Sequence, residues 1–106
     1  MVQLGKQLML NEILEVSTTI DQPRNLSSVM HKVSEEYGEL AKSYNKDHSI
    51  FVEEAADTII TIVDAVQQYV KETYGSESGI ATDVLLRDAI TLKLKKWQAV
   101  YGNQSK

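Results

Sequence analysis

The chain has 106 residues, a formal net charge of −4 and no cysteine. This length favours one domain spanning residues 1–106, and the lack of cysteine excludes disulfides, thiolate zinc sites and cysteine nucleophiles. The acidic balance disfavours nucleic-acid binding, because phosphate contacts need clustered lysine and arginine, and it favours a cationic partner.

Helical spacing of apolar residues begins near the N-terminus, where Met9, Ile13, Val16 and Ile20 recur every three or four positions. We expect this first helix to end before Pro23, which also separates it from the next element. The N-terminal residues lack the pattern of a signal peptide, and no apolar run is long enough to span a bilayer. We therefore expect a cytoplasmic protein with no membrane partner.

A second helix is expected after Ser27, a plausible N-cap. Its apolar positions recur at helical spacing and define one core face. They are Val29, Met30, Val33, Tyr37, Leu40, Ala41 and Tyr44.

Two further helices follow. The segment Asn45–Ser49 has turn composition, with Ser49 as a possible cap for a third helix that carries apolar residues from Val52 to Val70. The loop Gly75–Gly79 precedes a fourth helix, whose core stripe is Leu86, Ile90, Leu94, Trp97 and Tyr101. Four helices with short links predict an all-α, four-helix bundle-like domain.

Two carboxylate pairs stand out, Glu36 with Glu39 and Glu54 with Asp57, each separated by three residues on a predicted helix. Residues so spaced are neighbours on a helix surface, where like charges repel. A cation would offset this repulsion, and Mg²⁺ suits carboxylate oxygen ligands. We predict these four residues as metal ligands. Glu35 points away from the core face and takes a supporting role.

The residue pattern of the third helix predicts self-association. With Ile59 as the reference, Glu54 and Asp57 lie on the opposite side of the helix, and the apolar face is broad. A second packing surface against another subunit explains this pattern, which favours a homodimer or homotetramer.

A phosphorylated substrate would also need basic groups near the acids. Lys93 and Lys96 lie at the edge of the core stripe of helix four and are the candidates for phosphate contact. Solvated lysines that offset the helix dipole explain them equally well. A solvated acidic face is likewise the simpler interpretation of one carboxylate motif taken alone.

At these residues the sequence resembles the MazG-like proteins of the all-α nucleoside triphosphate pyrophosphatase superfamily. The shared pattern is Glu-Glu-x-x-Glu, here Glu35–Glu39, followed by Glu-x-x-Asp, here Glu54–Asp57. The resemblance implies Mg²⁺, with Mn²⁺ as a possible substitute, bound by the same four carboxylates. It also implies hydrolysis of a nucleoside triphosphate to monophosphate and pyrophosphate by a helical dimer or tetramer, with Glu35, Glu36, Glu39, Glu54 and Asp57 as catalytic residues.

Two alternatives remain open. Glu53–Asp57 also resembles the second motif of the phosphoribosyl-ATP pyrophosphatases of histidine biosynthesis, although the residues that follow lack the expected histidine. A non-catalytic helical interaction module, with its carboxylates serving solubility, is the rival of a different class.

Overall fold

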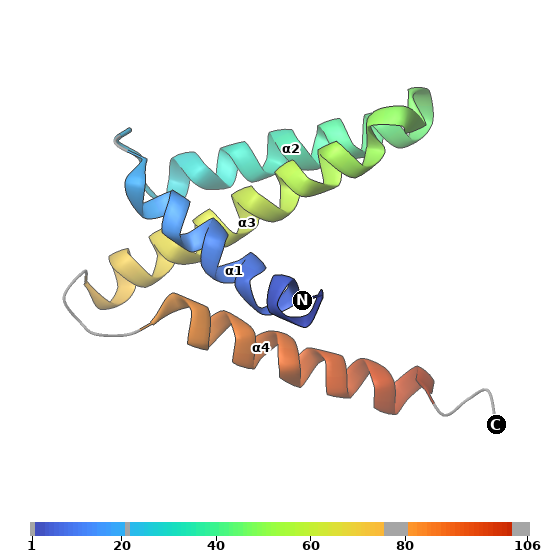
Figure 1. Ribbon diagram of the computed structural model, residues 1–106. Helices are drawn as coiled ribbons and strands as arrows, with labels where there is room; N and C mark the ends of the chain where they lie inside the picture. Colours follow the sequence, from blue (N-terminus) through green and yellow to red (C-terminus); the bar gives the residue numbers. More distant parts are fainter. Residues whose placement is uncertain (1, 21, 76–80, 103–106) are drawn as a thin grey trace.

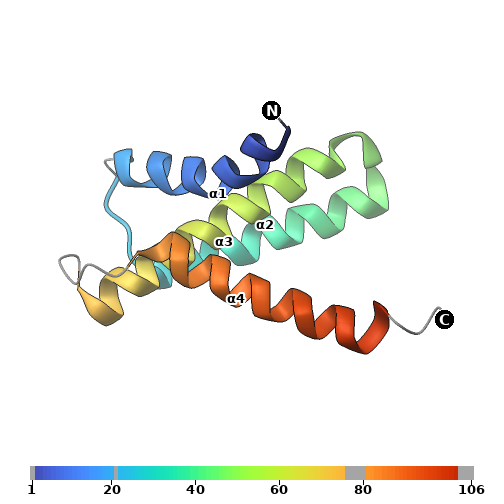
Figure 2. The ribbon, with the colours of Figure 1, turned by 60° about the horizontal axis from the view of Figure 1, so that its bottom comes forward.

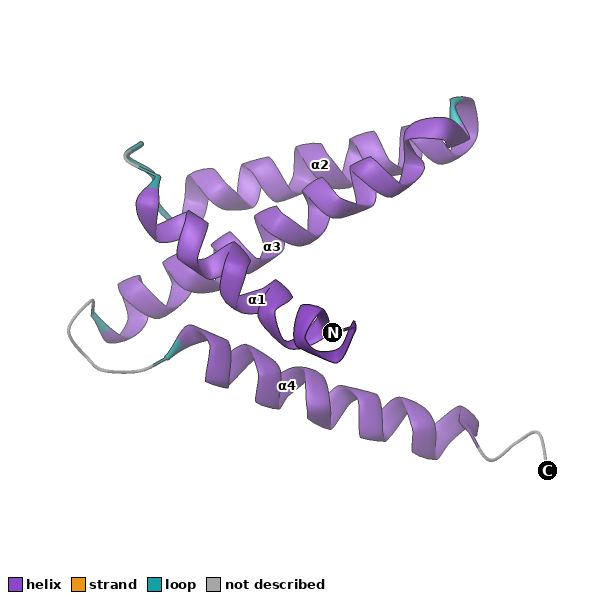
Figure 3. Cartoon of the chain, in the orientation of Figure 1, coloured by secondary structure: helices purple, strands orange, loops and turns teal. Residues whose placement is uncertain are grey.

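The computed structural model describes residues 2–20, 22–75 and 81–102, and all regular structure in these ranges is helical (Figures 1 and 3). The predicted all-α class is confirmed. The helices are α1 (Val2–Thr19), α2 (Leu26–Lys46), α3 (Phe51–Tyr74) and α4 (Thr82–Trp97). A 3₁₀ turn, His48–Ile50, precedes α3, and a π-helical turn, Gln98–Gly102, follows α4. Within the described ranges, no helix has the length and apolar character needed to span a bilayer.

Helices α2 and α3 form an antiparallel hairpin and pack along each other (Figure 1). Val29 and Ser43 of α2 are buried, as are Thr58 and Ala65 of α3. The predicted core face of the second helix is confirmed only in part: Val29 is buried against α3, whereas Met30, Tyr37 and Tyr44 are 50 to 65% exposed.

The N-cap of α2 differs from the prediction. Asn25, and not Ser27, caps the helix: its side chain accepts a hydrogen bond from the backbone N–H of Ser28 (2.8 Å), and the backbone N–H of Asn25 donates to Ser28 Oγ (3.1 Å). The two reciprocal hydrogen bonds satisfy two backbone N–H groups that would otherwise be unpaired. A cap at Ser27 alone would not satisfy both.

The turn before α3 also differs. Helix α2 continues through Lys46, and Asp47 accepts a hydrogen bond from the backbone N–H of Ser49 (3.1 Å). Ser49 thus lies inside the 3₁₀ turn and does not cap α3, which begins at Phe51. The predicted loop after α3 lies outside the described residues except for Gly75, whose φ of 88° ends the helix in a conformation that favours glycine.

In the described part of the chain the helices enclose only a small core, formed by Leu14, Val29, Val63, Ala65 and Val70. The radius of gyration is 16.0 Å, against about 13 Å for a compact domain of this length. Helix α1 crosses α3, and α4 contacts α3 and α1 but not α2 (Figures 1 and 2). The predicted core stripe of the fourth helix is wrong for the single chain: Ile90, Leu94, Trp97 and Tyr101 are 46 to 65% exposed.

A half-buried ion pair joins the connection after α1 to α3. Arg24 Nε lies 2.8 Å from Asp64 Oδ2, and both side chains are less than one-fifth exposed. Asp64 Oδ1 also accepts hydrogen bonds from Ser17 Oγ (2.7 Å) and Gln68 Nε2 (3.3 Å). Burial alone would raise the pKa of Asp64, but the hydrogen bonds from Arg24, Ser17 and Gln68, and the charge of Arg24, lower it.

Loss of this ion pair should destabilise the fold in a pH-dependent way. We expect Asp64→Asn to lower the free energy of unfolding at pH 7 by about 2 kcal/mol, between the values for exposed and fully buried pairs. Because the folded pKa of Asp64 is depressed, the ion pair stabilises above the unfolded pKa and is lost as the pH falls through the folded pKa. Urea unfolding from pH 7 to pH 3 measures this, with Asp88→Asn on the exposed surface of α4 as the control. A constant difference across this range would contradict the assignment.

Candidate metal centre

Three carboxylates from two helices meet at the α2–α3 junction. One ligand atom each from Glu36, Glu54 and Asp57 lies within 4.8 Å of the others. Glu36 and Glu54 are half-buried, and Asp57 is exposed. The carboxylates therefore gather at the edge of the hairpin, where they remain open to solvent on one side. We refer to these three residues as the acidic cluster.

Thr58 fixes the two helices beside the cluster. This residue is buried, and its hydroxyl lies 2.8 Å from the carbonyl oxygen of Glu54 and 3.2 Å from that of Glu36. The second contact crosses from α3 to α2. The backbones that carry two of the three carboxylates are thus joined through one side chain.

The cluster raises the pKa of Glu54 above its ordinary value. Loss of hydration is the largest cause, and the negative charges of Asp57, Glu39 and Glu36 add to it. The group therefore resists ionisation in the absence of a cation. This electrostatic situation favours binding of a positive ion, which would stabilise the charged form.

The structure brings together three of the four predicted ligands. Glu39 is exposed and near enough for its charge to act on Glu54, but it lies outside the acidic cluster. Glu35 lies outside the acidic cluster, is 71% exposed at its side chain and lies 3.9 Å from Lys32, and its supporting role stays a prediction.

The basic group beside the cluster is Lys32. Its Nζ lies 3.3 Å from Glu36 Oε2. Lys93 and Lys96, the predicted phosphate contacts, are exposed on α4, which does not contact α2. The end of α4 lies apart from the start of α3 in both views (Figures 1 and 2). Within one chain these two lysines are therefore not brought to the acids.

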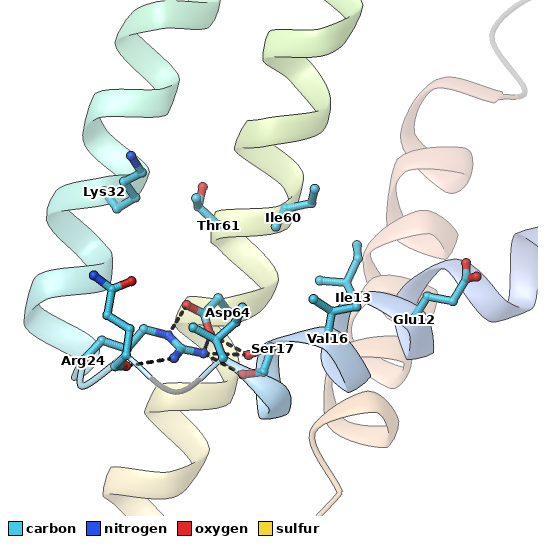
Figure 4. Close-up of a pocket in the computed structure, with 11 residues that line it drawn as sticks. Glu12, Ile13, Val16, Ser17, Arg24, Lys32, Ile60, Thr61 and Asp64 are labelled. Carbon is cyan, nitrogen blue, oxygen red and sulfur yellow. Dashed lines mark hydrogen bonds and ion pairs between the residues drawn. The ribbon is translucent and has the colours of Figure 1, made fainter.

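A cavity of about 460 Å³ lies between α1, α2 and α3, and none of the three cluster carboxylates lines it. Its apolar wall includes Ile13 and Val16 of α1, which lie opposite Ile60 of α3 (Figure 4). The Arg24–Asp64 pair closes one end. Lys32 also lines the cavity, so one lysine touches both the cavity and the acidic cluster.

The sequence analysis singled out neither Arg24 nor Lys32 as a site residue. The structure pairs Arg24 with Asp64 of α3. An arginine just after the only proline, far from Asp64 in sequence, gives no local signal of that pairing. Lys32 did carry a signal, its position one turn before Glu36, but the sequence does not show the cavity.

The donor set of the cluster fits a hard divalent cation. All ligand atoms are carboxylate oxygens, which Mg²⁺ and Mn²⁺ accept, and the open side leaves room for water or phosphate oxygens. No nitrogen or sulfur ligand accompanies them in the described cluster, which disfavours zinc.

Comparisons of the chain with protein-family models, with curated proteins and with solved structures find no match. The case for a function therefore depends on the residues and their arrangement.

Removal of one cluster carboxylate should weaken cation binding. We expect Glu54→Gln and Asp57→Asn each to lower Mg²⁺ and Mn²⁺ affinity at least about tenfold, as measured by calorimetry at pH 7.5. Glu53→Gln, on the same helix but outside the cluster, is the matched control. Glu39→Gln distinguishes a three-ligand site from the four-ligand site that the sequence predicts. It would weaken cation binding little if the site has only the three cluster ligands. Unchanged affinity in the first two variants would remove the site.

We expect the acidic cluster to lower the free energy of unfolding when no cation is bound. Because the folded pKa of Glu54 is raised, the folded state binds more protons than the unfolded state, and stability falls as the pH rises through that pKa. Glu54→Gln should therefore raise the Tm of the metal-free protein at pH 7 and reduce the further rise on adding Mg²⁺. A thermal melt with and without EDTA measures both effects. A lower Tm for metal-free Glu54→Gln would show a structural role instead.

Proposed function

We propose that the chain is a Mg²⁺-dependent pyrophosphohydrolase that cleaves a nucleoside or deoxynucleoside triphosphate to monophosphate and pyrophosphate. The observation that carries this proposal is the acidic cluster, formed by two helices and placed beside a cavity that shares Lys32 with it. The resemblance of Glu35–Glu39 and Glu54–Asp57 to the MazG-like motifs gives the reaction type.

In this proposal Glu36, Glu54 and Asp57 hold the cation, and Glu39 stands close enough to complete the set. A bound divalent cation would offset the charge of the triphosphate around the bond that breaks. Lys32 lines the cavity and contacts Glu36, so it adds a positive charge between the cavity and the acidic cluster. Glu35, exposed on α2 one residue before Glu36, is proposed to accept a proton from water.

The cavity supplies room for the nucleoside. Its volume is within the usual range for small-molecule sites, and apolar walls with a few polar groups are typical of them. The ribose and base would lie between α1 and α3, with the phosphates toward Lys32 and the cluster. Lys93 and Lys96 contribute only if another subunit presents them, and the chain works as a cytoplasmic homodimer or homotetramer in this proposal.

The rival function is a helical interaction module. It is favoured by the large apolar side chains that the single chain leaves exposed on α2, α3 and α4. Under this alternative, neutral variants of the cluster would leave partner binding unchanged, and no nucleotide would be hydrolysed.

A product assay over all ribo- and deoxyribonucleoside triphosphates and phosphoribosyl-ATP tests the activity. With Mg²⁺ or Mn²⁺ we expect monophosphate and pyrophosphate in equal amounts, and Glu54→Gln should lower kcat/KM at least about 100-fold because its carboxylate holds the cation. Glu53→Gln is the matched control and should retain activity.

The products distinguish the outcomes. Diphosphate with orthophosphate would mean attack at the terminal phosphate and would overturn the mechanism. Turnover of phosphoribosyl-ATP alone would establish the sister activity of histidine biosynthesis. Absence of turnover from protein that binds Mg²⁺ would favour the interaction module.

A further inference from the structure

Lys32 of α2 belongs both to the surroundings of the acidic cluster and to the wall of the cavity. Its Nζ lies 3.3 Å from Glu36 Oε2 and 3.9 Å from Glu35 Oε1. The same side chain lines the cavity between α1, α2 and α3 (Figure 4). One ammonium group is therefore placed to serve either a cluster carboxylate or a ligand in the cavity.

The contact between Lys32 and Glu36 is easily broken. The lysine side chain is 57% exposed, and exposed ion pairs shift an equilibrium only a few-fold. The order of the two residues is also the weaker one, because a glutamate that precedes a lysine by four positions stabilises a helix better than the reverse order. The ammonium group is carried on a flexible aliphatic stem. Lys32 can therefore leave Glu36 at little cost to the fold.

Glu36, in contrast, needs a positive partner. Its side chain is only 15% exposed, and its ligand atom lies within 4.8 Å of those of two further carboxylates. A negative charge in such a place is stabilised by a nearby positive one. In the structure Lys32 supplies that charge.

A divalent cation and Lys32 compete for this carboxylate. Mg²⁺ binds carboxylate oxygens at about 2.1 Å and carries twice the charge of the ammonium group, whose Nζ lies 3.3 Å from the same carboxylate. The two positive groups also repel each other. Binding of the cation at Glu36 therefore weakens the hold of this carboxylate on Lys32.

We propose that Lys32 is an exchangeable counter-ion of the acidic cluster. It pairs with Glu36 until a divalent cation binds there, and it then turns to the phosphate groups of a ligand in the cavity. This inference rests on the proposed function and adds the order of binding, with the cation first and the triphosphate second. Without the cation, phosphate binds weakly because the ammonium group that borders the cavity is held by a carboxylate.

Two simpler roles of Lys32 predict different behaviour. If Lys32 stayed on Glu36 after the cation binds, loss of its charge would not weaken the binding of phosphate. If Lys32 were a phosphate ligand independent of Glu36, loss of its charge would leave the affinity for the cation alone unchanged. Exchange between the two partners predicts two effects of opposite sign in one variant.

Calorimetry with Mg²⁺ alone, and with pyrophosphate in the presence of saturating Mg²⁺, measures both effects. At about 0.15 M salt, which screens distant charges, we expect Lys32→Gln to raise the affinity for Mg²⁺ alone about threefold because a competitor is lost. The same variant should lower the affinity for pyrophosphate about tenfold because a charged phosphate contact is lost. Lys42→Gln, exposed on the same helix, is the matched control and should change neither affinity. No binding of pyrophosphate, or any result in Lys32→Gln other than these opposite shifts, would overturn the proposal.

A second variant distinguishes exchange from repulsion at a distance. Lys32→Arg keeps the positive charge, but a guanidinium group holds a carboxylate through two hydrogen bonds and leaves it less readily. We expect Lys32→Arg to bind Mg²⁺ about threefold more weakly than the wild type. Repulsion alone predicts an unchanged affinity, and that result would overturn the proposal.

The exchange and the proposed activity fail separately. Opposite shifts in Lys32→Gln without turnover of any triphosphate would support the exchange and overturn the activity. Turnover with unchanged Mg²⁺ affinity in both Lys32 variants would overturn the exchange and leave the activity in place. A protein that binds no divalent cation would overturn both.

Discussion

The crowding of three carboxylates at the α2–α3 junction is the constraint on which the candidate metal centre depends. Loss of hydration raises the pKa of Glu54, and the negative charges of Asp57 and Glu36 raise it further. Packing of the two helices elsewhere along the hairpin holds the charges together without a cation. The crowded carboxylates therefore lower the stability of the fold, and the same carboxylates would bind a cation. Many proteins lose some stability at their functional sites in this way.

The open shape of the chain follows from where its apolar residues lie. Helices α2 and α3 each carry apolar residues over more of their circumference than one neighbour can cover, so Met30 and Ile62 stay exposed. The cavity beside Lys32 has the same origin, because α1 crosses α3 and does not run along it. A closed bundle would bury more area but would leave no cavity next to the acidic cluster.

The helices were predictable from the sequence because a period of 3.6 residues is a local signal. Glu36, Glu54 and Asp57 were predictable as a group because their spacing places each pair on one helix face. Burial was not predictable from the sequence. Tyr37 and Trp97 recur at core spacing, but periodicity identifies an apolar face without showing what covers it. Caps and ion pairs such as Asn25 and Arg24 depend on backbone geometry and distant partners, which no local pattern contains.

Thr58 contacts two carbonyl oxygens, one on each helix of the hairpin. This contact couples the position of α2 along α3 to the distances between the carboxylates of the acidic cluster. If α2 slides along α3, the bond from Thr58 to Glu36 lengthens together with the separation of the Glu36 and Glu54 carboxylates. A hydroxyl that also bonds within its own helix has little freedom to follow such a slide. The buried hydroxyl of Thr58 thus acts together with the packing of α2 on α3 to keep the dimensions of the cluster.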